Sequence, residues 1–328
     1  MTQATNSKPT TTNEHQFYDF QPHVVDYKTD IITGLSAEQR YISPKYFYDE
    51  RGSSLFVEIC KTDEYYPTRT ETAIIHEHIE DITATIGANC LLVEPGSGDS
   101  AKVRLLLDVL KPLAYCPMDI SKSYLEEEAR KLAAEFPWLN VHAVCTDFTT
   151  QLEIPANLTA PNTVAFFPGS TIGNFTPDDA VVFLKKIAAM LCHDGGLLIG
   201  VDLIKDSHIL NAAYNDAQGV TAEFNLNQLH RINRELDANF EVEKFRHYAF
   251  YNEAERRIEM HLVCEKQQTI IIDKHSFEFK VGDSIQTEYS HKYTLQSFID
   301  LAAKAGFSSV KTWTDSKQLF SLFYFKTA

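Results

Sequence analysis

The sequence predicts an α/β protein with a doubly wound parallel sheet and a second, mixed α+β domain. Between residues 90 and 203, short apolar runs alternate with amphipathic helical patterns, as in parallel sheets whose strands are joined by helices. The first of these runs leads straight into a glycine turn. From residue 204 to residue 292, a polar helical segment precedes several strand-like runs, which predicts the second domain.

Each element of the sheet domain follows from this pattern. The expected strands are residues 90–94, 114–118, 141–146, 163–168 and 196–203, and the expected helices are 102–110, 121–135 and 178–191. Ser121 and Thr176 stand where helix N-caps belong. A helix at 295–305 and strands near 310–313 and 320–325 return the chain to this domain.

The second domain is expected to contain a helix at 211–236 and strands at 244–251, 257–266 and 269–279. Residues 1–16 are rich in Thr, Asn, Gln and Ser without apolar periodicity, which predicts a disordered leader.

Composition narrows the possible partners. The 328-residue chain has a formal net charge of −15, which repels phosphate backbones and anionic lipid, so nucleic acid and membranes are poor partners. The 6 cysteines are scattered without a C-x-x-C pair, which indicates buried thiols in the cytoplasm. No signal core or membrane-spanning run is present. A small-molecule substrate fits this chain better.

The glycine turn at 91–100 predicts a cofactor site with an adenosine end. Gly96 and Gly98 allow a sharp turn and close approach of a ligand, and Lys102 follows at the start of a helix. Asp119 ends the second strand, where a carboxylate can accept both ribose hydroxyls. The same residues suit either S-adenosylmethionine or NAD. Two alternatives need no ligand: the glycines could form only a tight connection between strand and helix, and Asp119 could cap the helix that begins at Ser121.

Two further strand ends point to the same edge of the sheet. Asp147 and Phe148 follow the third strand and suit an adenine ring, although a single phenylalanine is more often core. Within residues 166–177, the stretch 169–174 holds Gly169, Asn174 and two hydroxyl side chains. Such a density of donors favours contact with a polar ligand over a plain turn.

Candidate substrate residues lie outside the sheet domain. Residues 41–69 are dense in aromatic side chains, including Tyr48 and Tyr65, whose faces favour a cation but which could equally be core. Glu288 and Ser290 alternate at strand spacing and therefore share a face, as a two-point polar grip or as a solvated surface. No histidine pattern for metal and no G-x-S-x-G motif for a nucleophile is present.

Several segments together resemble the histidine-specific N-alpha-methyltransferases of ergothioneine biosynthesis: residues 43–56, 64–69, 94–98, 169–174, 214–225 and 258–260. The resemblance spans nearly the whole ordered chain and favours S-adenosylmethionine over NAD. It implies a Rossmann-like class I methyltransferase domain, residues 70–204 plus 293–328, and a substrate-binding domain, residues 17–69 plus 205–292. We expect the enzyme to be cytoplasmic, as the cysteines indicate, and monomeric.

The resemblance also implies roles for individual residues. Gly96, Lys102, Asp119, Asp147 and Phe148 correspond to cofactor contacts. Tyr65, Gly169, Asn174, Tyr214, Met260, Glu288 and Ser290 correspond to substrate contacts, with Asn174 and Tyr214 at the carboxylate of the amino acid and Tyr65, Glu288 and Ser290 at its imidazole. Tyr48 corresponds to a tyrosine near the substrate amine.

The implied reaction is direct attack of the α-amine of L-histidine on the methyl group of S-adenosylmethionine, three times, to give hercynine. Pro95 and Asp99 to Ala101 depart from the family pattern in the cofactor loop. Tyr289 and His291 depart from it beside Ser290, so a related aromatic amino acid remains an alternative substrate. A catalytically silent S-adenosylmethionine-binding module and an NAD-dependent dehydrogenase are the alternatives from other classes.

Overall fold

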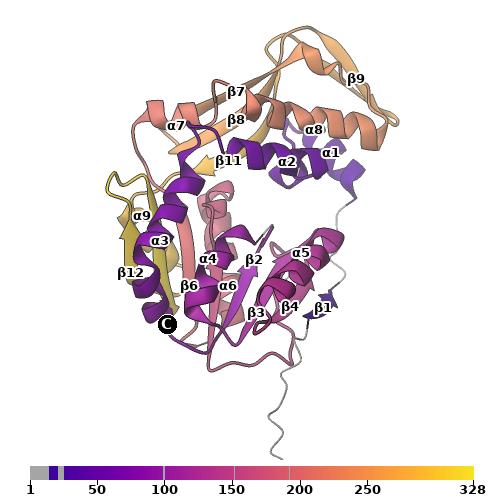
Figure 1. Ribbon diagram of the computed structural model, residues 1–328. Coiled ribbons are helices and arrows are strands. Elements are labelled where there is room, and N and C mark those ends of the chain that lie inside the picture. Colours follow the sequence, from indigo (N-terminus) through magenta and orange to yellow (C-terminus); the bar gives the residue numbers. More distant parts are fainter. Residues whose placement is uncertain (1–14, 21–25, 99, 151, 192) are drawn as a thin grey trace, which may run out of the picture.

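The computed structural model describes residues 15–20, 26–98, 100–150, 152–191 and 193–328. Figure 1 shows two parts, a large sheet flanked by helices and a smaller sheet with helices packed against it. The large sheet has eight strands in the order β1-β4-β3-β2-β5-β6-β13-β12. Their bounds are β1 (His15–Asp19), β2 (Cys90–Pro95), β3 (Ala114–Asp119), β4 (Asn140–Cys145), β5 (Asn162–Phe167), β6 (Gly196–Asp202), β12 (Phe307–Thr314) and β13 (Phe320–Thr327).

The order of these strands confirms the doubly wound sheet. Strands β1 to β6 pair in parallel, and β13 runs antiparallel to both β6 and β12. The chain order reverses between β2 and β5, and ligands of open α/β sheets bind where it reverses, beyond the carboxyl ends of the strands.

Helices cover both faces of the large sheet. One buried apolar cluster joins it to α3 (Tyr66–Ile86), α4 (Ala101–Leu110) and α5 (Lys122–Glu135), and another joins its opposite face to α6 (Pro177–Leu191) and α9 (Leu295–Ala303). Both faces of the parallel strands are therefore apolar, which explains why β2 is buried along its whole length.

The second part contains the three-stranded antiparallel sheet β11-β8-β7, the hairpin of β9 and β10, and the helices α1, α2, α7 and α8 (Figure 1). The bounds are α1 (Tyr27–Ser36), α2 (Glu50–Ile59), α7 (Ser207–Ala213), α8 (Val220–Leu236), β7 (Phe245–Asn252), β8 (Arg257–Cys264), β9 (Gln268–Ile272), β10 (His275–Phe279) and β11 (Ser284–His291). Three short 3-10 helices, η1 (Pro44–Phe47), η2 (Thr171–Asn174) and η3 (Val242–Lys244), complete the described elements.

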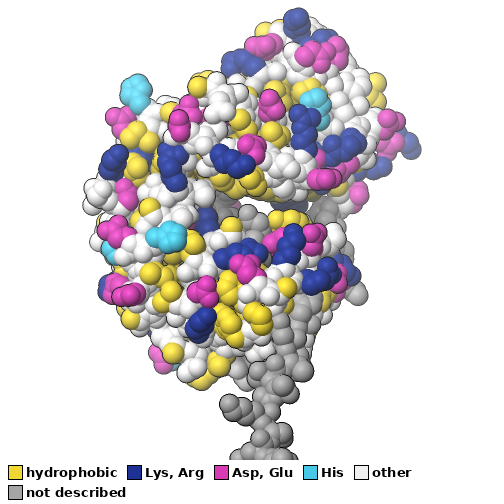
Figure 2. Space-filling view, in the orientation of Figure 1, with side chains coloured by type: hydrophobic (Ala, Val, Ile, Leu, Met, Phe, Trp, Pro, Cys, Tyr) yellow, Lys and Arg dark blue, Asp and Glu magenta, His cyan; other side chains and the backbone are white. Residues whose placement is uncertain are grey.

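The two parts meet where β6 and β11 end. Tyr293 N donates to Asp202 O at 3.2 Å, and Ile204 N donates to Tyr293 O at 2.9 Å. These bonds bring the end of the central sheet beside the end of β11, although about ninety residues of sequence separate them. The space-filling view shows a hollow between the two parts on this face of the molecule (Figure 2).

Three local predictions differ from the structure. The helix expected at 211–236 is two helices, α7 and α8, because Asp216 accepts the backbone N–H groups of Val220 and Thr221 and starts a new helix. The strand expected at 269–279 is a hairpin that turns at Asp273, whose φ is 53°.

The first strand is the third difference. Residues 15–19 form β1 and pair with β4 at the edge of the large sheet, although the sequence division places 15–16 in the leader and 17–19 in the second domain. Apolar Phe17 packs on the core of that sheet, which supplies the physical reason. Residues 1–14 of the predicted leader lie outside the described residues.

Candidate active site

The glycine turn follows β2 at the point where the chain order of the sheet reverses. Gly96 and Gly98 have φ values of 68° and 51°, a region that glycine occupies at little cost. Gly96 N and Ser97 N donate to Met118 O at 2.7 and 3.1 Å, which fixes the turn against the end of β3. Buried Glu94, just before the turn, accepts a hydrogen bond from the phenol of Tyr115.

Asp119 lies at the end of β3, beside this turn. Its Oδ2 accepts from Gly98 N at 3.3 Å, and its Oδ1 accepts from Ser121 N at 2.9 Å. Ser121 occupies the N-cap position of α5 without a side-chain cap, and the Asp119 carboxylate binds the backbone N–H at this helix start, as its alternative capping role predicts. The carboxylate is held at the carboxyl edge of the sheet, where a ribose can meet it.

Phe148 closes the other side of the turn. A Cβ on Gly96 would lie 3.1 Å from its ring, and the ring packs edge-on against Phe167 and Phe183. Its neighbour Asp147 is fixed by Thr149, whose backbone N–H and hydroxyl donate to Oδ1 at 3.0 and 2.6 Å. The turn without a Cβ, the aromatic face and the two carboxylates fit a nucleoside with an adenine base.

Lys102 and Gly169 both bind the carboxylate of Glu71, a residue that the sequence did not predict as part of the site. The Lys102 ammonium pairs with the fully buried carboxylate of Glu71, from α3, and Gly169 N donates to both oxygens of that carboxylate at 3.0 Å. A Cβ on Gly169, whose φ is 83°, would lie 3.1 Å from the Lys102 nitrogen. Glu71 therefore joins the predicted cofactor side of the site to the predicted substrate side.

Asn174 reaches the second part of the molecule through η2. A Cβ on Gly173 would lie 2.8 Å from His291 O and 3.5 Å from Ser290 Oγ, so a glycine is needed for this close approach to β11. The Asn174 side chain is half-buried and makes no hydrogen bond within the described part of the chain. Its amide is therefore available to a ligand.

An aromatic wall continues from these groups. The ring centroids of Tyr48 and Phe56 are 5.7 Å apart, those of Phe56 and Tyr65 are 6.2 Å apart, and those of Tyr65 and Tyr214 are 6.4 Å apart. Met260 from β8 is fully buried behind them in the same apolar cluster. Burial raises the pKa of Tyr48 although 47% of its surface is exposed, as expected of a side chain that lines a hollow.

Glu288 stands among these tyrosines on β11. Burial raises the pKa of Tyr48, Tyr65 and Tyr214, and the charge of Glu288 adds to each rise, which places the carboxylate near all of them. Burial raises the pKa of Glu288 from 4.5 to about 7, and the positive charge of Lys292 opposes that rise only in part. No hydrogen bond to this carboxylate is present among the described residues, so a ligand with an N–H donor would satisfy it.

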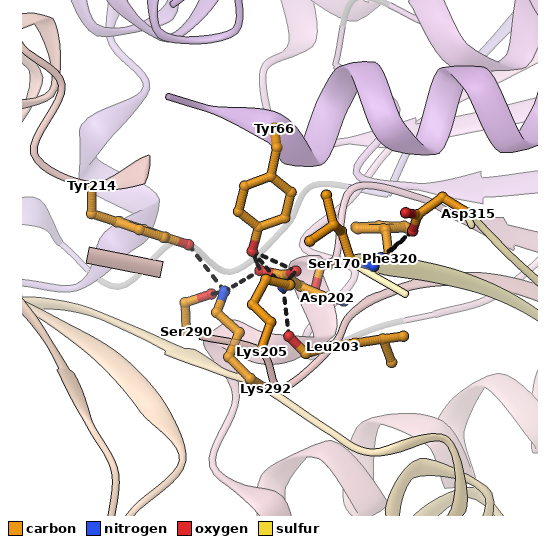
Figure 3. Close-up of polar contacts among 11 residues, drawn as sticks. Tyr66, Ser170, Asp202, Leu203, Lys205, Tyr214, Ser290, Lys292, Asp315 and Phe320 are labelled. Atoms are coloured by element: carbon orange, nitrogen blue, oxygen red, sulfur yellow. Dashed lines mark hydrogen bonds and ion pairs between the residues drawn. The ribbon is translucent and has the colours of Figure 1, made fainter. Parts of the chain in front are cut away.

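A network of buried charges lies next to Ser290 (Figure 3). Lys292 and Lys205 pair with the Asp202 carboxylate at 2.7 and 2.5 Å, and the phenol of Tyr66 donates to the same carboxylate at 2.8 Å. Lys292 also donates to Ser290 Oγ at 2.8 Å and to the phenol oxygen of Tyr214 at 3.3 Å.

The structure thus gathers most of the predicted substrate residues, and the sequence analysis missed several supporting ones: Tyr66, Glu71, Asp202, Lys205 and Lys292. Alternation continued one residue beyond β11 would have found Lys292, which follows residues 288 and 290 at the same two-residue spacing and donates to Ser290. Asp202 ends a strand, as Asp119 does, and could have been found by the same rule. Glu71 gave no local signal, because the glycine that makes room for it, Gly200, is far away in sequence.

Two other kinds of feature are absent from the described residues. No group of three or more His, Cys, Asp or Glu side chains there is arranged to hold a metal ion. None of the helices in this part of the chain combines the length and hydropathy that a membrane span requires.

Comparisons with known proteins agree on one family. The family profile described as histidine-specific methyltransferase, SAM-dependent, matches residues 27–327. The histidine N-alpha-methyltransferase of Mycolicibacterium smegmatis is 39% identical over 90% of this chain and 93% of its own length, and that of Mycobacterium tuberculosis is 38% identical over the same shares. Ergothioneine biosynthesis protein 1 of Neurospora crassa is 29% identical over 88% of this chain and 34% of its own length.

The matched region includes both parts of the molecule, and with it the glycine turn, Glu288 and Ser290. The sheet order, the glycine turn after β2 and the extent of the match lead to one conclusion. The chain belongs to the family of histidine-specific, S-adenosylmethionine-dependent methyltransferases and is a class I methyltransferase with a second, mixed α+β part.

Proposed function

We propose that the protein transfers three methyl groups from S-adenosylmethionine to the α-amine of L-histidine, giving hercynine, the trimethylated amino acid, for ergothioneine biosynthesis. The two mycobacterial relatives are named histidine N-alpha-methyltransferases, and the Neurospora relative is named for ergothioneine biosynthesis. The proposal includes a division into residues 70–204 plus 293–328 for the cofactor and residues 26–69 plus 205–292 for the substrate, a cytoplasmic location and a monomeric state.

The observation that carries the substrate assignment is the Glu288 carboxylate in its aromatic recess. A carboxylate in such a recess is costly unless a donor reaches it, and an imidazole N–H is a donor on a flat ring that fits between tyrosines. Ser290, two residues away on the same strand face, offers a second polar contact at the width of one ring. Buried Met260 forms the apolar floor of this recess.

The cofactor side is assigned from the glycine turn. Gly96 and Phe148 would enclose the adenine end of the cofactor, and Asp119 and Asp147 would accept hydrogen bonds from its nucleoside. Lys102, held by its ion pair with Glu71, would lie on the same side of the site. S-adenosylmethionine, when bound, supplies an electrophilic methyl group on a sulfonium. Gly169 borders both sides, so the amino acid and the methyl donor would meet there.

The chain's own residues act on the substrate by positioning. Asn174 and Tyr214 would bind the carboxylate, so that the α-amine points toward the methyl donor. Burial raises the pKa of Tyr48, so its phenol stays protonated at neutral pH and orients the amine through a hydrogen bond without acting as a base. The tyrosine faces also suit the ammonium that each methyl transfer produces.

Mass spectrometry of L-histidine, tryptophan, tyrosine and phenylalanine, each incubated with protein and S-adenosylmethionine, tests the proposal. We expect stepwise gain of up to three methyl groups on histidine alone. Methylation of another amino acid and not of histidine would overturn the substrate assignment. Cofactor binding by calorimetry without turnover of any amino acid would replace it with a silent binding module.

Glu288→Ala supplies the matched variant. We expect this change to raise the KM for histidine by about a hundredfold or more, since a site built around an N–H donor loses its acceptor, while affinity for S-adenosylmethionine changes little. Unchanged histidine kinetics in Glu288→Ala would show that the ring does not lie against this carboxylate.

A further inference from the structure

We propose that Lys292 is a positioning residue that sets the direction of the hydrogen bonds at the substrate site: it donates to Ser290 and Tyr214, so that both hydroxyl groups donate to the bound amino acid. The inference rests on the proposed function and deepens it. It assigns the site a preference for one form of the ring, a neutral imidazole with one N–H and one bare nitrogen.

The contacts of Lys292 account for every proton on its ammonium group. The nitrogen lies 2.7 Å from Asp202 Oδ2, 2.8 Å from Ser290 Oγ and 3.3 Å from the phenol oxygen of Tyr214 (Figure 3). An ammonium has three donors and no acceptor, so all three oxygens must accept. Lys292 is only 3% exposed, so water does not compete for these bonds.

The charge of Lys292 is secured by its partner. Burial alone would lower the pKa of this lysine, but the Asp202 carboxylate outweighs burial and raises it, so the ammonium is retained. The same carboxylate has its own pKa lowered, because burial is outweighed by Lys292 and Lys205. The direction of the hydrogen bonds from Lys292 is therefore fixed across neutral pH.

The direction propagates to the two hydroxyl groups. Each hydroxyl has one proton, and each now accepts from Lys292, so each proton must find an acceptor elsewhere. In the structure, which holds no amino acid, Ser290 also donates toward the phenol oxygen of Tyr214, so a ring nitrogen has to replace that contact to receive the Ser290 proton. With an amino acid bound, we expect the Ser290 proton to go to a ring nitrogen and the Tyr214 proton to go to the carboxylate.

The imidazole ring is then bound by one hydrogen-bond acceptor and one donor. Glu288 can only accept when ionised, and Ser290 donates, so the favoured ring has one N–H and one bare nitrogen. An indole or a pyrrole has the N–H but no bare nitrogen, and it would leave the buried proton of Ser290 unpaired. An unpaired buried donor of this kind lowers affinity by roughly 10- to 100-fold.

The test compares Lys292→Met with Lys205→Met. Both lysines are buried and pair with Asp202, but Lys205 contacts Tyr66 and Leu203 O, and neither Ser290 nor Tyr214 is among its described contacts. The two variants therefore remove the same charge from the same carboxylate. The ligands are L-histidine and 3-pyrrolylalanine, whose ring keeps the N–H and has C–H in place of the bare nitrogen.

We expect the wild type to favour histidine over pyrrolylalanine by roughly 10- to 100-fold, measured as the inhibition constant of pyrrolylalanine divided by the KM for histidine. Lys292→Met should reduce that ratio to about threefold or less, with a larger change in KM than in kcat, because Ser290 can then reorient. Lys205→Met should keep the ratio. A preference that survives in Lys292→Met, or that falls equally in Lys205→Met, would overturn the inference.

Ser290→Ala keeps the inference testable if Lys292→Met does not fold. Ser290→Ala alone should remove the preference for histidine over pyrrolylalanine. If Lys292→Met folds, adding Ser290→Ala to it should not reduce that preference further. A preference retained in Ser290→Ala would overturn the assignment of the donor. Failure of the wild type to methylate histidine at all would instead refute the proposed function, before any variant is compared.

Discussion

Replacing Glu288 with glutamine should change how the stability of the protein depends on pH. Glutamine keeps the shape of the side chain and removes the ionisation. Burial raises the pKa of Glu288 from 4.5 to about 7, with Lys292 in opposition, so the native state holds a proton that the unfolded chain releases. The free energy of unfolding contributed by Glu288 therefore falls as the pH rises from about 4.5 to 7.

The size of the effect follows from that shift. A rise from 4.5 to about 7 corresponds to about 3 kcal/mol at about 1.4 kcal/mol per unit. Solvent in the hollow screens part of this, so we expect the Glu288→Gln protein to gain about 1–3 kcal/mol relative to the wild type between pH 5 and pH 8.

Urea unfolding without ligand at pH 5, 6, 7 and 8 measures the difference. Asp30→Asn is the control: although burial opposes it, hydrogen bonds from Lys45 and Tyr46 lower the pKa of Asp30, so the stability from this residue is lost only as the pH falls below about 4. Its difference from the wild type should stay flat from pH 5 to 8. An equally flat difference for Glu288→Gln would refute the assigned burial of the carboxylate.

Three further changes test the scaffold of the site. Gly96→Ala should weaken S-adenosylmethionine binding about tenfold in calorimetry, since the residue has a φ of 68° and its Cβ would crowd Phe148; unchanged affinity would contradict the role of the turn. Asp216→Ala should cost about 1–2 kcal/mol in urea unfolding and raise the KM for histidine, because α8 loses its cap beside Tyr214; unaltered stability would contradict this. Glu71→Gln should cost about 1–3 kcal/mol, measured by thermal unfolding, because Lys102 loses its charged partner; a neutral result would show that the pair is dispensable.

The sheet could be predicted because its signals are local. Apolar runs ended by glycine or aspartate located β2 and β3 within about a residue of their observed ends, and helix periodicity located α4 and α6 as well. The break between α7 and α8 was missed because Asp216, whose carboxylate binds the first backbone N–H groups of α8, lies inside a continuous polar helical pattern.

The candidate site could be predicted only in part. Residues at strand ends and at alternating positions of β11 were found because each rule needs a few neighbouring residues. The pairing of Asp202 with Lys292 depends on two strands meeting across the chain, and that of Glu71 with Lys102 on a helix crossing the sheet. Such partners are set by tertiary packing, so no local pattern contains them.

Fragmentation mass spectrometry of the product formed from L-histidine and S-adenosylmethionine tests most directly whether the ring is held and the amine is methylated. We predict that all added methyl groups leave with the α-nitrogen as trimethylamine, while the imidazole fragment keeps its original mass. Methyl groups found on the imidazole ring would mean that the ring faces the methyl donor, and would contradict the placement of the ring against Glu288 and Ser290.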